Sequence, residues 1–130
     1  MVVKYPSLHN IKIVLVEDHS DIRLLIVRFL SDQGAQIFAA KNAFEGLRLV
    51  REIQPDVILS DLKMPGRDGF ELLADIQDLS RSLGRTIPVI AITALRHKQK
   101  QTAAAGFRSH LEKPFTPDEL LAAIDRVLHQ

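Results

Sequence analysis

Short apolar runs alternate along the chain with longer segments in which apolar residues recur every three or four positions. Most of the runs are rich in β-branched residues, which favours strands, and they lie at residues 11–16, 36–39, 57–59, 88–92 and 107–111. The segments between them have the period of an amphipathic helix and begin near Ser20, Asn42, Asp68, Lys98 and Thr116. This alternation predicts an α/β fold with a parallel sheet, helices on both faces and right-handed crossovers.

Several predicted helix ends carry residues that commonly cap helices. Ser20 is expected to cap the first helix, and Asn42 with Glu45 three residues later is typical of a capping box. Residues 116–119, Thr-Pro-Asp-Glu, combine a cap, a proline at the first helical position and an acid at the third. Gly34 stands where a glycine after a helix is expected.

Length and composition restrict the class of protein. The 130 residues suffice for one domain, which we expect over residues 11–130 after an N-terminal lead of residues 1–10. The net charge of +1 gives no reason to expect nucleic acid or membrane as a partner. The absence of cysteine excludes disulfides and thiolate-ligated zinc. Without an apolar run of about 18 residues or a signal peptide, we expect a soluble, cytoplasmic protein.

Acidic residues and one lysine follow the predicted strands at the point where each strand ends. Glu17 and Asp18 come after the first run, Asp61 after the third and Lys113 after the fifth. In an open parallel sheet these positions meet in a crevice at the carboxyl edge. Two carboxylates ~4 Å apart repel by roughly 4 kcal/mol at an effective dielectric constant near 20. Either Lys113 or a hard divalent cation such as magnesium could offset this repulsion.

Each of these residues also has an ordinary structural explanation. Adjacent acids can form a solvated turn, and a lysine before a proline is usually a surface residue. Thr93, at the end of the fourth run, is a common strand-end residue, although its hydroxyl could also bond a phosphoryl oxygen at Asp61. The Lys113–Pro114 peptide bond could be cis, which would aim the lysine inward.

Four motifs in order give the chain a resemblance to the receiver domain of two-component response regulators over residues 11–128. They are Val-Glu-Asp at 16–18, Ser-Asp-x-x-Met-Pro-Gly-x-Asp-Gly at 60–69, Ile-Thr-Ala at 92–94 and Leu-x-Lys-Pro-Phe at 111–115. The resemblance implies a flavodoxin-like three-layer (βα)5 sandwich with a five-stranded parallel sheet of order 2-1-3-4-5.

The resemblance also implies roles for individual residues. Asp61 would accept a phosphoryl group, Lys113 would pair with the acyl phosphate, and Thr93 would be the switch hydroxyl. Mg²⁺ or Mn²⁺ would be ligated by Asp18, Asp61 and the backbone carbonyl of Lys63, with Glu17 acting through a water.

The implied partners are proteins. A histidine kinase or a histidine phosphotransfer protein would donate the phosphoryl group. The face of the fourth helix, fifth strand and fifth helix would control a downstream protein or an attached domain, with no direct contact to nucleic acid or membrane. Receivers often dimerise through this face, and the sequence leaves the oligomeric state open. Such a protein is a signalling phosphoacceptor rather than an enzyme, although it assists its own phosphorylation and dephosphorylation.

Several residues depart from the pattern or stand outside it. His110 occupies a position where many receivers carry tyrosine or phenylalanine; it is either a titratable switch residue or an ordinary strand histidine. Leu95, two residues past Thr93, cannot polarise water, so we predict slow spontaneous dephosphorylation. The basic run at 96–100 is a solvated helix start or a docking site for an acidic partner. The other histidines show no metal-ligand spacing and are interpreted as surface residues: His9, His19, His97 and His129.

Other functions remain as alternatives. A receiver-like module could bind partners without phosphorylation, although such modules usually lose an acid or the lysine. An aspartyl phosphohydrolase usually needs a further acid where Lys63 stands. A flavin-binding flavodoxin is disfavoured because no phosphate-binding loop rich in Ser, Thr and Gly follows the first strand. Whether the domain is free-standing or belongs to a larger chain stays open.

Overall fold

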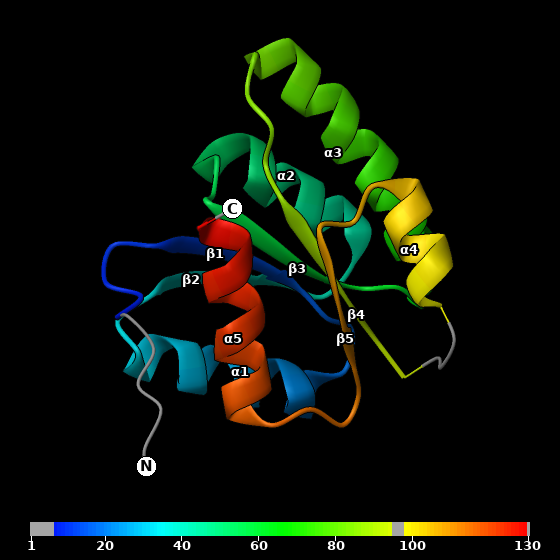
Figure 1. Ribbon diagram of the computed structural model, residues 1–130. Coiled ribbons are helices and arrows are strands. Elements are labelled where there is room, and N and C mark those ends of the chain that lie inside the picture. The colour runs from blue at the N-terminus through cyan, green and yellow to red at the C-terminus, as the bar shows by residue number, and fades with distance from the viewer. Residues whose placement is uncertain (1–6, 95–97, 130) are drawn as a thin grey trace.

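A computed structural model describes residues 7–94 and 98–129 of the chain. Strands and helices alternate throughout, as the sequence predicts (Figure 1). The elements are β1 (Lys12–Val16), α1 (Ser20–Asp32), β2 (Gln36–Ala40), α2 (Ala43–Ile53), β3 (Val57–Asp61), α3 (Gly69–Leu83), β4 (Val89–Thr93), α4 (Gln99–Ala105), β5 (Ser109–Glu112) and α5 (Pro117–Leu128).

The five strands form one parallel sheet with the order β2-β1-β3-β4-β5. This is the predicted flavodoxin-like order. The chain reverses direction across the sheet between β1 and β3, because β2 lies on one side of β1 and the later strands lie on the other. Loops that leave β1 and β3 therefore diverge, and a crevice is expected between them at the carboxyl edge.

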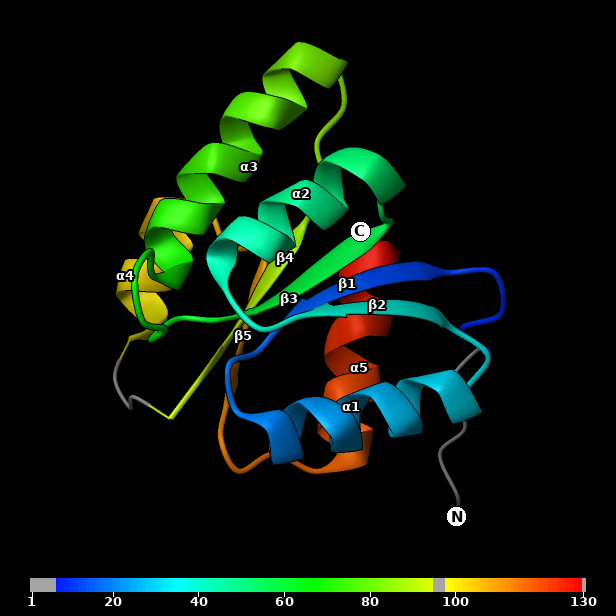
Figure 2. The ribbon, with the colours of Figure 1, turned by 180° about the vertical axis from the view of Figure 1, so that it is seen from behind.

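Helices cover both faces of the sheet, with α1 and α5 on one side and α2, α3 and α4 on the other (Figures 1 and 2). Alternate strand residues supply the two cores. Ile13 and Leu15 of β1 pack on the α1/α5 side, and Val14 and Val16 pack on the α2/α3 side. All four are fully buried. Apolar side chains on both faces explain why the inner strands have uninterrupted apolar sequences.

Helix caps agree with the sequence in most places and differ in two. The capping boxes at the starts of α3 and α5 form with both hydrogen bonds in place. The prediction for Ser20 was wrong: it is the first helical residue, and His19 is the N-cap without a capping hydrogen bond from its side chain. Asn42 accepts a hydrogen bond from the Glu45 amide, but the Glu45 carboxylate bonds the Lys41 amide, so the reciprocal bond to Asn42 is missing.

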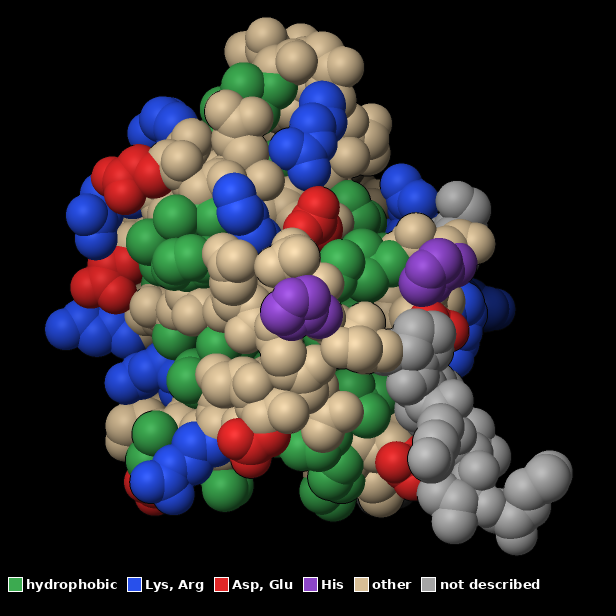
Figure 3. Space-filling model, turned by 90° about the vertical axis from the view of Figure 1, so that its left-hand side faces the viewer, with side chains coloured by type: hydrophobic (Ala, Val, Ile, Leu, Met, Phe, Trp, Pro, Cys, Tyr) green, Lys and Arg blue, Asp and Glu red, His purple; other side chains and the backbone are tan. Residues whose placement is uncertain are grey.

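The face of the molecule drawn in Figure 3 carries both signs of charge. On the face shown in Figure 3, basic and acidic side chains are interspersed with small apolar areas. This agrees with the net charge of +1, since a large field of one sign would require a clear excess of one type. Among the helices of residues 7–94 and 98–129, none combines the length and apolarity that a membrane crossing requires.

Candidate functional site

A cavity of about 660 Å³ opens at the carboxyl edge of the sheet. It is bordered by the segments that follow β1, β3, β4 and β5. Its lining includes the predicted site residues Asp18, Asp61, Lys63, Thr93 and Lys113, together with His19. Residues that are up to 95 positions apart in the sequence thus share one cavity, because parallel strands deliver their last residues to the same edge.

Asp61 is the last residue of β3 and is 7% exposed. The backbone around it is held closely. Its register partner is Ile92 of β4, and the hydroxyl of Ser60 donates a hydrogen bond to its carbonyl. Gly69, at the start of α3, approaches so closely that a Cβ atom there would lie 2.3 Å from the Asp61 carbonyl oxygen. Glycine is therefore required at position 69, and the loop between β3 and α3 is held against Asp61.

Lys113 connects two of the acids. Its Nζ lies 2.5 Å from Glu17 Oε1 and 3.1 Å from Asp61 Oδ2. Its amide also donates to the Thr93 carbonyl at 2.8 Å, which ties the end of β5 to the end of β4. The Lys113–Pro114 bond is cis, as we considered from the sequence. The predicted meeting of acids and lysine at this edge is thereby confirmed.

Glu17 is buried to an unusual degree for an acid, with 1% of its surface exposed. Lys113 satisfies Oε1, whereas Oε2 has no hydrogen-bond partner within the described residues. An unpaired buried carboxylate oxygen is costly, and proteins keep such groups where a ligand or an ion completes them. Glu17 itself does not line the cavity, but one of its carboxylate oxygens lies within 4.8 Å of ligand atoms of Asp18 and His19, which do. The orphaned oxygen is thus the first sign that a further positive group belongs beside this acid pair.

The charges of the site do not balance at neutral pH. Burial raises the pKa of Glu17 to about 7; the nearby Asp61 carboxylate adds to the rise, and Lys113 opposes it. Burial lowers the pKa of Lys113, but its hydrogen bond to Glu17 and the charge of Asp61 outweigh this, and the pKa lies above its ordinary value. Glu17 is therefore only partly ionised near pH 7, and above this pH one ammonium group faces two carboxylates, with Asp18 next to Glu17.

Arg23 was not predicted to belong to the site. Its guanidinium donates to the backbone carbonyl of Glu17 at 2.8 Å and to that of Asp18 at 3.4 Å. It therefore holds the backbone of the acid pair from the first turn of α1. A basic residue in the first turn of a helix interacts unfavourably with the helix dipole. The unusual position of Arg23 in the sequence was therefore the signal that could have identified it as a site residue.

The donor set at this edge fits a divalent cation. Ligand atoms of Glu17, Asp18 and His19 lie within 4.8 Å of one another. Carboxylate oxygens are the ligands that magnesium prefers, and the unpartnered Oε2 of Glu17 leaves one of them available. His19 is exposed, as expected for a surface residue, but it also lines the cavity beside Asp18, within reach of a ligand group that its sequence spacing did not indicate.

Thr93 is 1% exposed at the end of β4 and lines the cavity. Lys63 lines it from the loop after β3. Leu95 lies outside the described residues, so slow dephosphorylation stays a prediction. Arg96 and His97 of the basic run also lie outside them.

His110 is half-buried on β5 and connects this strand to α4. Its Nδ1 lies 3.2 Å from the hydroxyl of Thr102, which in turn donates to the Gln99 carbonyl at 3.0 Å. Because the hydroxyl has one proton and gives it to Gln99, His110 Nδ1 must carry the proton of their shared bond. Nε2 is then a buried acceptor, and within the described residues it has no partner. His110 thus joins β5 to α4 through one side-chain bond, and its role as a switch residue stays a prediction.

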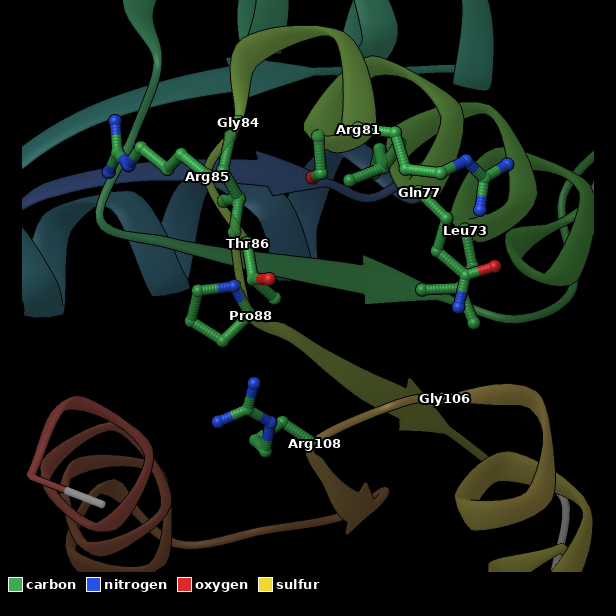
Figure 4. A pocket seen from close by; sticks show the side chains of 12 residues that line it. Leu73, Gln77, Arg81, Gly84, Arg85, Thr86, Pro88, Gly106 and Arg108 are labelled. Carbon is green, nitrogen blue, oxygen red and sulfur yellow. The ribbon is translucent and has the colours of Figure 1, made fainter.

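A second cavity of about 500 Å³ lies at the opposite, amino edge of the sheet. Arginine residues 81, 85 and 108 line it (Figure 4). The guanidinium groups of Arg81 and Arg85 point away from each other in this view. Arg85 donates to the carbonyls of Gln54 and Pro55, so its charge is engaged by the backbone of a neighbouring loop.

Comparisons of the sequence and of the structure with known proteins point to the same family. The model of the response regulator receiver domain matches residues 13–125. Sporulation initiation phosphotransferase F of Bacillus subtilis is 33% identical over 121 residues, which cover 92% of this chain and 94% of that protein.

Solved structures agree. The chemotaxis response regulator CheY4 of Vibrio cholerae superposes with a TM-score of 0.83 at 30% identity, covering 92% of this chain and 99% of that one. The receiver domain of the sensor histidine kinase PA1611 of Pseudomonas aeruginosa gives a TM-score of 0.82 at 28% identity, covering 93% and 99%. In that structure a magnesium ion is coordinated in the active site cleft.

Proposed function

This chain belongs to the response regulator receiver domain family, and on that premise we propose that Asp61 is its phosphoacceptor. Receiver domains are signalling phosphoacceptors and are generally not classed as enzymes. The proposal for this chain is that Asp61 receives a phosphoryl group from the histidine of a kinase or phosphotransfer protein. Thr93 and Lys113 then bind the new phosphoryl oxygens.

The observation that carries this proposal is the contact between Lys113 and Asp61 inside the cavity. The ammonium lies 3.1 Å from Oδ2 of a carboxylate that is almost buried but still lines an open cavity of about 660 Å³. A purely structural ion pair would not need such a space. A nucleophile that must be reached by a partner's phosphohistidine does need it.

The proposed transfer requires little covalent chemistry from the protein. A carboxylate oxygen of Asp61 attacks the phosphorus; a P–O bond forms, the P–N bond to the histidine breaks, and the imidazole leaves with the electron pair. Lys113 is placed to neutralise charge that gathers on the phosphoryl oxygens, so catalysis depends on position and electrostatics. Thr93 lies on the neighbouring strand end, where its hydroxyl can donate to one of these oxygens.

Divalent metal completes the proposed site. Asp18, Asp61 and the backbone carbonyl of Lys63 would hold Mg²⁺ or Mn²⁺ directly, and Glu17 would act through a water. When bound, the ion supplies the positive charge that the acids at this edge lack. The unpartnered Glu17 Oε2 and the oxygen-rich donor set support this assignment.

We further propose that phosphorylation changes the face formed by α4, β5 and α5, which contacts a downstream protein, an attached domain or a second copy of the chain. Two connections support this route. The Lys113 amide bonds the Thr93 carbonyl, and His110 bonds Thr102 of α4. Inward movement of Thr93 and Lys113 toward a phosphoryl group would therefore pull on β5 and, through His110, on α4.

The test is intact-mass measurement after incubation with acetyl phosphate, with and without Mg²⁺. We expect a single phosphoryl adduct that requires Mg²⁺, forms on the wild type and is missing from Asp61→Asn. Asp78→Asn is the matched control, because Asp78 is an exposed acid on α3 that pairs with Arg81. It should form the adduct like the wild type.

Two results would contradict the proposal. An adduct on Asp61→Asn would place the phosphoryl group on another residue. No adduct on a folded wild-type protein with Mg²⁺ bound would favour a module that binds partners without phosphorylation.

A further inference from the structure

We propose that His19 is an additional ligand of the divalent-cation site, which enables this chain to bind imidazole-favouring metals such as Zn²⁺ and Co²⁺ more tightly than Mg²⁺. The inference rests on the proposed function in one respect, since it uses the same acids that are assigned to the magnesium ion. It adds a nitrogen donor to a set otherwise made of oxygen atoms.

The first support is the geometry around His19. One ligand atom from each of Glu17, Asp18 and His19 lies within 4.8 Å of the other two. Tetrahedral ligands with bonds of about 2.0–2.2 Å lie roughly 3.3–3.6 Å from one another. Side-chain movements of about 1 Å would bring donor atoms spread over as much as 4.8 Å into this range. His19 is exposed, so its ring is not enclosed by neighbouring side chains.

The second support is the buried Glu17 oxygen. Glu17 is 1% exposed, and its Oε2 lacks a hydrogen-bond partner among the described residues. This is an acceptor already removed from water, so a cation that binds it has little desolvation left to overcome on the protein side. The cluster is therefore more than a set of exposed acids, which are common on protein surfaces.

The third support is that the His19 side chain has no role in capping the helix. His19 occupies the N-cap of α1, where Ser, Thr, Asp or Asn would normally accept a hydrogen bond, yet its side chain makes no such bond. It lines the cavity with Asp18 and Asp61. The imidazole is thus placed toward the site while the residue contributes little to the start of the helix.

Ligand chemistry then gives the direction of the selectivity. Imidazole suits Zn²⁺, Co²⁺ and Ni²⁺, whereas Mg²⁺ prefers oxygen ligands and retains waters. Lys113 and Arg23 both bond residues of this cluster or of its immediate surroundings, and Lys63 also lines the cavity. Lys113 bonds Glu17 Oε1 and Asp61, and Arg23 bonds two backbone carbonyls. Neither contacts the free Oε2 of Glu17.

The experiment is direct metal titration of the metal-free protein, without any phosphodonor. Co²⁺ binding is followed by its visible absorption, which reports nitrogen ligation, and Zn²⁺ and Mg²⁺ are measured by competition with Co²⁺. The variants are His19→Ala and His19→Asn; asparagine keeps a favourable helix cap without the imidazole. His129→Ala is the matched control, because His129 is also exposed and lies 3.0 Å from a carboxylate, that of Asp125.

We expect both His19 variants to lose about tenfold or more in affinity for Co²⁺ and Zn²⁺, on the order of the loss that follows removal of a metal-site residue. Their affinity for Mg²⁺ should stay within about twofold, and the Co²⁺ spectrum should change shape. His129→Ala should match the wild type throughout. Equal Co²⁺ affinity and an unchanged spectrum in the His19 variants would overturn the inference.

The outcome is separable from that of the proposed function. If the His19 variants and the wild type bind Co²⁺ alike while Asp61 still accepts a phosphoryl group, only the inference fails. If Co²⁺ binding depends on His19 but acetyl phosphate gives no adduct, the metal site stands and the phosphoacceptor proposal fails.

Discussion

The two edges of the sheet each contain a cavity and a cluster of charged residues, but the clusters differ in how their charges are satisfied. At the carboxyl edge, Glu17 and Asp61 are buried, share one lysine and leave a carboxylate oxygen without a partner in the described residues. At the amino edge the arginines are exposed; Arg85 donates to backbone carbonyls and Arg81 pairs with Asp78.

The difference shows what distinguishes a functional site from an ordinary surface cavity. The two cavities are of similar size, about 660 and about 500 Å³, so volume does not distinguish them. They differ in whether their charged side chains converge on one point. The acids point toward one ammonium group across three strand ends, whereas the guanidinium groups of Arg81 and Arg85 point apart (Figure 4). Only the carboxyl edge retains buried charge that folding alone does not explain.

The largest effect should come from removing the central cation. Lys113→Met leaves Glu17 and Asp61 buried without their counter-charge, and we expect a loss of about 3 kcal/mol in unfolding free energy at pH 8. The equivalent change at the other edge, Arg85→Met, should cost less than about 1 kcal/mol because that side chain is exposed. Urea unfolding of the metal-free proteins measures both.

A double variant serves as the control that separates the loss of charge from the loss of packing by the lysine side chain. Glu17→Gln combined with Lys113→Met removes the cation and one of the two buried carboxylates, so only Asp61 stays uncompensated, and the double variant should recover part of the lost stability. A double variant as unstable as Lys113→Met would mean that the lysine stem, and not the charge, supports the fold.

A smaller effect of opposite sign should follow from Glu17→Gln alone. The pKa of Glu17 rises to about 7 in the folded protein, above its ordinary value of 4.5. Between these pH values the folded state holds a proton that the unfolded state has lost, so this residue makes stability fall as pH rises. Below about pH 4.5 Glu17 is protonated in both states and does not destabilise the fold, and above about pH 7 its destabilising effect is complete.

We therefore expect Glu17→Gln to stabilise the metal-free protein by about 1–3 kcal/mol at pH 8 and by almost nothing near pH 4. Asp56→Asn at the amino edge is the contrast, since the Asp56 carboxylate accepts a hydrogen bond from the Lys12 amide at 2.8 Å. That variant should be neutral or slightly destabilised. Thermal unfolding of both variants across pH 4–8 measures these changes. The prediction is wrong if the two substitutions change stability by the same amount at each pH.

Much of the fold and of this asymmetry could be predicted from the sequence, because both depend on local patterns and one topological rule. Alternating apolar runs and amphipathic segments predicted a parallel α/β sheet, the resemblance of four motifs to receiver domains implied the strand order, and the rule for carboxyl edges predicted that Glu17, Asp61 and Lys113 meet. Strand β3 was underestimated. Ser60 and Asp61 are polar and were placed after the strand, yet both are buried and Asp61 still pairs with Ile92.

Contacts between distant side chains were not predictable in the same way. How the helices pack on the sheet determines three features that the sequence did not predict. These are the N-cap position of His19, the hydrogen bonds of Arg23 to two backbone carbonyls, and the bond between His110 and Thr102. Composition and hydrophobic period do not predict such pairs. The bonds of Arg23 span five and six positions and that of His110 spans eight, and in each pair the partners belong to different segments of the fold.

The smallest effect tests whether the asymmetry at the carboxyl edge extends to α4. Thr102 is 1% exposed and its hydroxyl bonds both the Gln99 carbonyl and His110. We expect a double-mutant cycle of Thr102→Val and His110→Phe to show a coupling of about 0.5–1.5 kcal/mol in unfolding free energy, the size of one buried hydrogen bond. His110→Phe fills the site with a ring of similar size and removes the buried, unpartnered Nε2. It should therefore cost less than Thr102→Val, which leaves the imidazole with no acceptor for its proton.

If the two changes are additive, α4 and β5 are not coupled through this bond. The proposed transmission of the signal from Asp61 to the α4 surface would then have to depend on Lys113 and Thr93 alone.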